Sequence, residues 1–266
     1  MRRSRSLPLI TSLATATITV LTLAGPAQAA VGDRYVALGD SYSSGLGTGS
    51  YISSSGSCSR STSAYSALWA AAYAPASYTS VACSGATTTS VTNTQLSALS
   101  STTTLVSITV GGNDVGFSHI METCALYGTT ECVNAVQAAE NMAQTQLPGL
   151  LDNVYNGIRS AAPNARVVVL DYPVFYQLNT FCIGLSATSR AKIDEGINLL
   201  DGVLSSAASR HSFIFADVRS IFVGHQLCSG DKWLHALNFV DLAVSYHPTS
   251  DGHSRGYLPV FTAAAG

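Results

Sequence analysis

The sequence carries little charge. Asp, Glu, Lys and Arg make up only 11% of its 266 residues, and the formal net charge is −2 at pH 7. Nucleic-acid binding depends on basic surfaces that neutralise phosphate groups. The composition therefore gives no electrostatic case for a nucleic-acid partner, and we expect none.

Long apolar runs are also absent, apart from one short stretch near the N-terminus. Residues 1–29 contain a basic start, an apolar stretch from Leu7 to Leu23 and the small residues of GPAQAA. These are the three parts of a secretory signal peptide. No later segment approaches the ~18 apolar residues of a membrane-spanning helix. We expect a cleaved signal peptide over 1–29 and a single secreted domain over 30–266, without a transmembrane segment.

Apolar, β-branched runs alternate with segments of helical periodicity along the rest of the chain. This alternation predicts a central parallel sheet covered by helices on both faces, a three-layer α/β/α fold. Sites in such folds form at the carboxyl ends of the strands. We expect strands near 34–39, 78–83, 103–110, 165–173 and 212–218, and helices over 63–73, about 131–160 with a break at Pro148 and Gly149, and about 189–210.

Four short motifs follow predicted strands or loops. They are VALGDSYSSG (36–45), SGATTT (84–89), GGND (111–114) and HPTSDGH (247–253). In the first, Ser41 follows a buried strand and precedes small residues, so main-chain N–H groups could converge on a developing oxyanion. One serine proves little in a serine-rich chain. A parallel sheet could, however, bring all four motifs to one edge.

In the order and content of these motifs the chain resembles the SGNH (GDSL) hydrolase family, particularly its secreted actinobacterial lipases and phospholipases A1. The resemblance implies a flavodoxin-like fold and ester hydrolysis through an acyl-enzyme, without cofactor or metal. It assigns Ser41 as the nucleophile and His247 as its base. It also implies an oxyanion hole made of the Ser41 N–H, the Gly85 N–H and the Asn113 amide.

The chain departs from the common family pattern at Val244, where an Asp usually stands three residues before the base. Some secreted actinobacterial members use a main-chain carbonyl there, and the resemblance implies that the Val244 carbonyl orients His247. Asp241 and Asp251 remain alternatives. His253 is a rival base, but no Pro follows it.

Six cysteines in an exported chain favour three disulfides, although fifteen pairings are formally possible. A zinc site is disfavoured because CxxC and clustered Cys/His spacings are missing. We favour pairing in chain order, because each bridge then closes a loop beside a predicted active-site segment. The pairs would be Cys58 with Cys83, Cys124 with Cys132, and Cys182 with Cys228.

The leading functional hypothesis is a lipase or carboxylesterase that acts on lipid esters, with phospholipase A1 and carbohydrate acetylesterase as alternatives. A non-catalytic binding protein would be expected to lack one of the four motif residues, and none is missing. We expect a monomer that takes a lipid or other small ester, at a lipid–water interface. Several residues could line the pocket: Phe117, His119, Tyr172, Phe175 and Tyr176.

Overall fold

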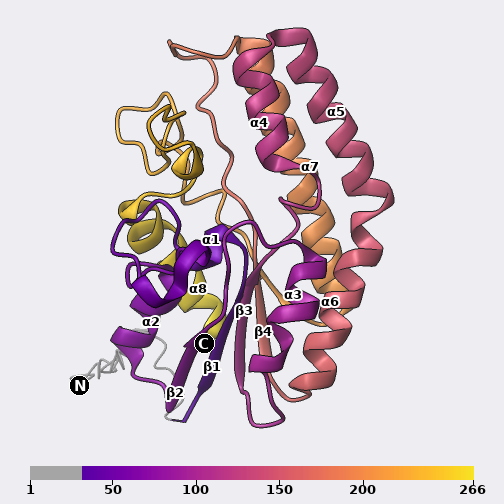
Figure 1. The fold of residues 1–266 in the computed structure, drawn as a ribbon, viewed down its shortest axis with the longest axis vertical. Helices are drawn as coiled ribbons and strands as arrows, with labels where there is room; N and C mark the ends of the chain where they lie inside the picture. Colours follow the sequence, from indigo (N-terminus) through magenta and orange to yellow (C-terminus); the bar gives the residue numbers. More distant parts are fainter. Residues whose placement is uncertain (1–31) are drawn as a thin grey trace, which may run out of the picture.

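Five parallel strands form one sheet in the order β2-β1-β3-β4-β5 (Figure 1). A computed structural model describes residues 32–266, so the expected signal peptide lies outside the described residues. The strands are β1 (Arg34–Gly39), β2 (Ser77–Ser80), β3 (Leu105–Thr109), β4 (Arg166–Leu170) and β5 (Ile214–Ala216). Strand β3 is buried along its whole length, as expected for a strand covered on both faces.

Helices cover both faces of the sheet and confirm the predicted three-layer α/β/α class (Figure 1). One face carries α2 (Tyr65–Tyr73) and α8 (Leu258–Ala265). The other carries α3 (Thr88–Thr94), α6 (Leu147–Ala161) and α7 (Ala187–Arg210). Aromatic rings fill the space under α2 and α8, where Tyr35 of β1 packs on Trp69 and Phe261.

Two further helices, α4 (Phe117–Leu126) and α5 (Thr129–Thr145), extend past the carboxyl ends of the strands, where α5 packs against α7 and α4 packs against α5 (Figure 1). The short helix α1 (Ser41–Ser44) lies at this same edge. The predicted run 131–160 is divided as expected into two helices, α5 and α6, and the break lies at Gln146, two residues before Pro148. Pro148 occupies the first turn of α6, where its missing N–H costs nothing.

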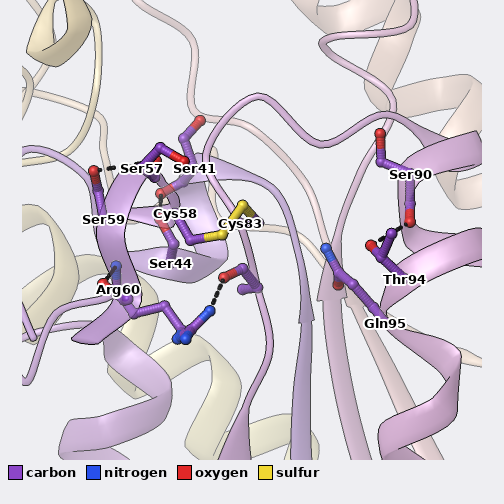
Figure 2. Close-up of a disulfide and its surroundings, with 12 residues drawn as sticks. Ser41, Ser44, Ser57, Cys58, Ser59, Arg60, Cys83, Ser90, Thr94 and Gln95 are labelled. Atoms are coloured by element: carbon purple, nitrogen blue, oxygen red, sulfur yellow. Dashed lines mark hydrogen bonds between the residues drawn. A yellow bond between two sulfur atoms is a disulfide. The ribbon is translucent and has the colours of Figure 1, made fainter.

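The three disulfides pair in chain order, which confirms that prediction: Cys58–Cys83, Cys124–Cys132 and Cys182–Cys228. The first lies next to the segment that carries Ser41 (Figure 2). Within residues 32–266, every helix is too short or too polar to cross a membrane.

Candidate active site

Ser41 is the first residue of α1 and follows β1 after a single connecting residue. The backbone turns at Gly39, whose φ of +117° favours glycine, and a side chain there would collide with the main chain of Thr109. Asp40 then caps α1, because its Oδ1 accepts the N–H of Tyr42 at 3.0 Å. The nucleophile candidate therefore stands on a short, fixed turn.

The Asp40 carboxylate is held by two further donors. Its Oδ1 accepts from the Thr109 hydroxyl at 2.7 Å, and its Oδ2 accepts from the Tyr172 hydroxyl at 2.5 Å. Burial raises the pKa of Asp40 to about 6, although these hydrogen bonds act against the rise. Asp40 therefore links β1 to β3 and to the segment after β4.

Gln95 supports the same turn, and sequence reasoning missed it. Its Oε1 accepts the N–H of Gly39 at 2.7 Å, and its Nε2 donates to the Gly39 carbonyl at 2.9 Å. Figure 2 shows its side chain on the far side of β1 from the Cys58–Cys83 disulfide. No motif marks a single glutamine 54 positions after the nucleophile candidate, because the contact depends on how α3 docks.

The two candidate oxyanion donors lie on neighbouring turns at this edge. Gly85 has φ +78° in a turn that is anchored where the Cys83 N–H donates to the Gly39 carbonyl at 2.9 Å. The Asn113 amide donates to the carbonyl of Ala86 at 3.0 Å, which joins the second and third motifs. Asn113 and Ser41 also line one small cavity of about 40 Å³.

Two more contacts that sequence reasoning missed tie the motifs together. The Asp114 carboxylate, the last residue of GGND, accepts from the N–H and hydroxyl of Thr88. The Tyr42 hydroxyl donates to the carbonyl of Tyr246 at 2.7 Å and so connects the serine and histidine segments. Tyr42 and Asp114 each lie within one of the four motifs, and this position is the sequence signal that could have identified them.

His247 meets Ser41 directly. Its Nε2 lies 2.7 Å from the Ser41 Oγ, and both side chains are buried. Burial lowers the pKa of His247 to about 4, so the imidazole is neutral at pH 7. A neutral imidazole at this distance can accept the serine proton.

The structure contradicts the expectation that the Val244 carbonyl orients the His247 ring. The Nδ1 atom of His247 lies 3.0 Å from the main-chain oxygen of Ser245, whereas the Val244 oxygen accepts the main-chain N–H of His247 at 3.1 Å. The reason is the positive φ of Tyr246, +66°, which turns the chain so that the Ser245 carbonyl faces the ring. A residue count along the chain could not show this turn.

The alternative carboxylates are engaged elsewhere. Asp241 caps the short helix that follows it by accepting the N–H of Ala243 at 3.2 Å. Asp251 pairs with Arg255 at 3.5 Å on the surface. Within residues 32–266, the hydrogen bonds of the His247 ring go only to Ser41 and Ser245.

His253, the rival base, lies in the core. Its Nδ1 accepts the main-chain N–H of Tyr65 at 3.2 Å, and its ring stacks on the Tyr65 ring. It is fully buried, and burial lowers its pKa to about 3. These contacts give His253 a structural role, and His247 is the histidine that contacts Ser41.

Two adjoining grooves open at this edge. The proximal groove, about 410 Å³, contains His247 and is lined by Phe117, Ser118, Met121, Glu122, Ala125, Leu126, Leu237, Phe239, Leu242, Ala243, Ser245 and Tyr246. The distal groove, about 910 Å³, lies between the turn after α4, the segment 181–189 and the segment 227–246. It contains neither Ser41 nor His247. Of the expected pocket aromatics, Phe117, Tyr172 and Phe175 line the small cavity with Ser41, and Tyr176 lines the distal groove. His119 is exposed on α4 and lines neither groove.

Among the described residues, no group of three or more His, Cys, Asp or Glu side chains could hold a metal ion. The chemistry that the geometry supports is proton transfer between a serine and a neutral histidine. The turns of the second and third motifs, which carry the Gly85 N–H and the Asn113 amide, lie at the same edge of the sheet.

Comparisons with known proteins identify relatives of this chain. Residues 37–255 match the GDSL-like Lipase/Acylhydrolase family. The chain is 52% identical to Lipase 1 of Streptomyces coelicolor over 268 aligned positions, which cover 100% of both chains. It is 51% identical to a lipase of Streptomyces rimosus over 231 positions, 86% of each chain.

Two solved structures have the same fold. The phospholipase A1 of Streptomyces albidoflavus NA297 superposes with a TM-score of 0.86 at 50% identity, over 88% of this chain and 100% of that chain. The extracellular lipase of Streptomyces rimosus gives a TM-score of 0.86 at 51% identity, with the same coverage. The chain therefore belongs to the GDSL-like lipase/acylhydrolase family and is a carboxylic ester hydrolase.

Proposed function

We propose that this protein is a secreted lipase that cleaves acyl esters of lipids through an acyl-enzyme on Ser41. The observation that carries the proposal is the 2.7 Å contact between the Ser41 Oγ and the Nε2 of a neutral, buried His247. An activated serine beside a base is the arrangement that acyl transfer requires.

The reaction begins when His247 takes the Ser41 hydroxyl proton on Nε2 and the serine oxygen attacks the ester carbonyl carbon. The resulting oxyanion accepts hydrogen bonds from the N–H groups of Ser41 and Gly85 and from the Asn113 amide. When the intermediate collapses, the ester C–O bond breaks and His247 returns its proton to the leaving alcohol. A water, deprotonated by His247, then attacks the acyl-enzyme and releases the carboxylic acid.

The Ser245 carbonyl supports this cycle by holding the imidazole in one tautomer. It accepts the Nδ1 proton, so the Nε2 lone pair faces Ser41. A carbonyl stabilises the imidazolium less than a buried carboxylate would. We therefore propose a Ser41–His247 dyad with a main-chain orienter.

The walls of the proximal groove favour a lipid over a small polar ester. Met121, Leu126, Phe239 and Leu242 are apolar, and Glu122 is the one charged lining residue. Phe239 is 77% exposed and Leu242 is 64% exposed, which leaves a large apolar surface in water beside His247. Such a surface is typical of a site that meets a lipid–water interface.

Phospholipase A1 activity is the second candidate, favoured by the 50% identity to the Streptomyces albidoflavus enzyme. A carbohydrate acetylesterase fits less well, because an acetyl group would leave most of the apolar proximal groove empty.

Secretion is supported by the three disulfides, which form in oxidising compartments. The mature protein should appear in the culture medium with its N-terminus at residue 30 or 31.

The test of function is hydrolysis of p-nitrophenyl esters from acetyl to palmitoyl, with trioctanoylglycerol and dioctanoylphosphatidylcholine alongside. We expect activity on medium or long chains that disappears in Ser41→Ala. Activity confined to the acetyl ester would indicate a deacetylase, and activity that survives in Ser41→Ala would exclude this nucleophile.

A further inference from the structure

The distal groove is larger than the proximal groove and holds no residue of the proposed dyad. Its walls come from the turn between α4 and α5, the segment 181–189 and the segment 227–246. In Figure 1 these segments lie together beyond the carboxyl ends of the strands. The groove therefore opens on the same side of the molecule as Ser41.

The two grooves share one wall. Ala125, Leu237, Phe239 and Tyr246 line both. The shared wall is firmly placed at Tyr246, whose carbonyl accepts the Tyr42 hydroxyl and whose ring stacks on Phe175. A ligand bound at His247 could thus reach the distal groove by crossing this wall.

The distal groove is mostly apolar, with Lys232 as its one charged lining residue. Phe181 and Ile183 stand in its wall at 86% and 87% exposure, the largest exposed fractions among its apolar side chains. Two disulfides brace the walls, since Cys124, Cys182 and Cys228 are also lining residues. A braced groove with water-exposed apolar walls fits an apolar ligand.

We propose that the distal groove binds the non-reacting chain of a lipid that carries two acyl chains, while the reacting chain occupies the proximal groove. This inference rests on the proposed function. Two chains on neighbouring carbons of a glycerol leave the ester region side by side, so they need two adjoining apolar grooves that share a wall. Single-chain esters would use the proximal groove alone.

The proposal predicts a binding preference for two chains over one. Each methylene removed from water is expected to tighten binding about fourfold. Ala236 is exposed and lines the distal groove but not the proximal one, so Ala236→Trp would place a large side chain in the distal groove and obstruct it. The matched control is Ala138→Trp, at an exposed position of α5 that lines neither groove.

The experiment measures competitive inhibition of p-nitrophenyl butyrate hydrolysis by two non-hydrolysable ethers below their aggregation limits. These are 1,2-di-O-hexylglycerol and 1-O-hexylglycerol. We expect the diether to bind at least tenfold more tightly in the parent and in Ala138→Trp, and the two ethers to bind equally in Ala236→Trp. Butyrate hydrolysis by Ala138→Trp should stay within twofold of the parent, and thermal unfolding of both variants checks that they fold.

Equal inhibition by both ethers in the parent would overturn the proposal, as would a diether preference that persists in Ala236→Trp. Weaker binding of both ethers in Ala236→Trp would also overturn it, because the groove would then serve the reacting chain. Failure of the proposed function has a different signature. It would appear as butyrate hydrolysis by Ser41→Ala, or as failure to cleave any lipid ester, without a change in the ratio of the two inhibition constants.

Discussion

The Nδ1 atom of His247 lies 3.0 Å from the carbonyl oxygen of Ser245, two residues earlier in the chain. The left-handed conformation of Tyr246 between them makes this contact possible. The imidazole is thus oriented by its own backbone segment. In this arrangement the third member of the proposed site is a peptide group, which no side-chain substitution removes.

Asp241→Asn and Asp251→Asn should therefore each retain at least half of the parent kcat/KM on p-nitrophenyl butyrate. Both carboxylates bond elsewhere and neither meets His247. Steady-state kinetics of the two variants checks this, with Ser41→Ala as the inactive reference. A loss of a hundredfold or more in either variant would show that a carboxylate, and not Ser245, orients the base.

The pH profile of kcat/KM should have its acid limb near pH 4, because burial lowers the pKa of His247 to about 4. Below that pH the imidazole is protonated and cannot accept the Ser41 proton. An ordinary histidine would place the limb near pH 6.5. The measurement is kcat/KM from pH 3.5 to 8, with circular dichroism in the same buffers to confirm folding. A limb at pH 6 or above would contradict the burial argument.

The pH dependence of stability should follow the buried carboxyl groups. His247 and His253 stay neutral in the fold, with pKa values of about 4 and 3, so their contribution lowers the free energy of unfolding as the pH falls below 6.5. Three aspartates act in the opposite sense, because burial raises the pKa of Asp40 to about 6, of Asp194 to about 7 and of Asp171 to about 8. The folded state therefore holds more protons than the unfolded state between pH 7 and 5, and the free energy of unfolding should rise as the pH falls. Urea unfolding at pH 7 and pH 5 checks the sign, and lower stability at pH 5 would contradict it.

Asn113→Ala should lower kcat by about 10² to 10³ while the protein stays folded, because it removes one proposed oxyanion donor. The lost hydrogen bond to the Ala86 carbonyl should cost about 1 kcal/mol of stability. Asn113→Asp is the near-isosteric comparison. It should be at least as inactive, since a carboxylate would face the developing oxyanion. Measurements of kcat and thermal unfolding check both variants, and near-parent kcat in either would remove Asn113 from the oxyanion hole.

Gln95→Leu should lower the free energy of unfolding by about 1–3 kcal/mol, because it leaves the N–H of Gly39 without its partner, while the Gly39 carbonyl keeps the N–H of Cys83. Gln137→Leu, at an exposed position of α5, is the matched control and should change stability by under about 0.5 kcal/mol. Urea denaturation of both variants is the measurement. Equal stability of the two variants would show that the Gln95 contact contributes nothing.

Much of the fold was predictable from the sequence by itself, because periodicity and burial are local properties. The mostly apolar runs at 34–39, 105–109 and 166–170 favour a sheet that is covered on both faces, and their alternation with helices favours parallel strands. The order of the six cysteines, together with the position of the motifs, was also enough to predict the disulfide pairs.

Only the tertiary structure decided how the site is supported. The contact of Ser41 with His247 spans 206 positions and exists because the C-terminal helix packs back over the sheet, against β4 and β5. Gln95 and Ser245 carry no sequence signal, and the sequence marked Tyr172 as a pocket residue without showing its bond to Asp40. Each of the three acts through a hydrogen bond that depends on docking angles or on one backbone turn. The choice of Ser245 over Val244 depends on a single φ angle, and residue spacing does not encode it. The two grooves likewise arise where loops from distant parts of the chain meet, so their shape is a property of the packed molecule.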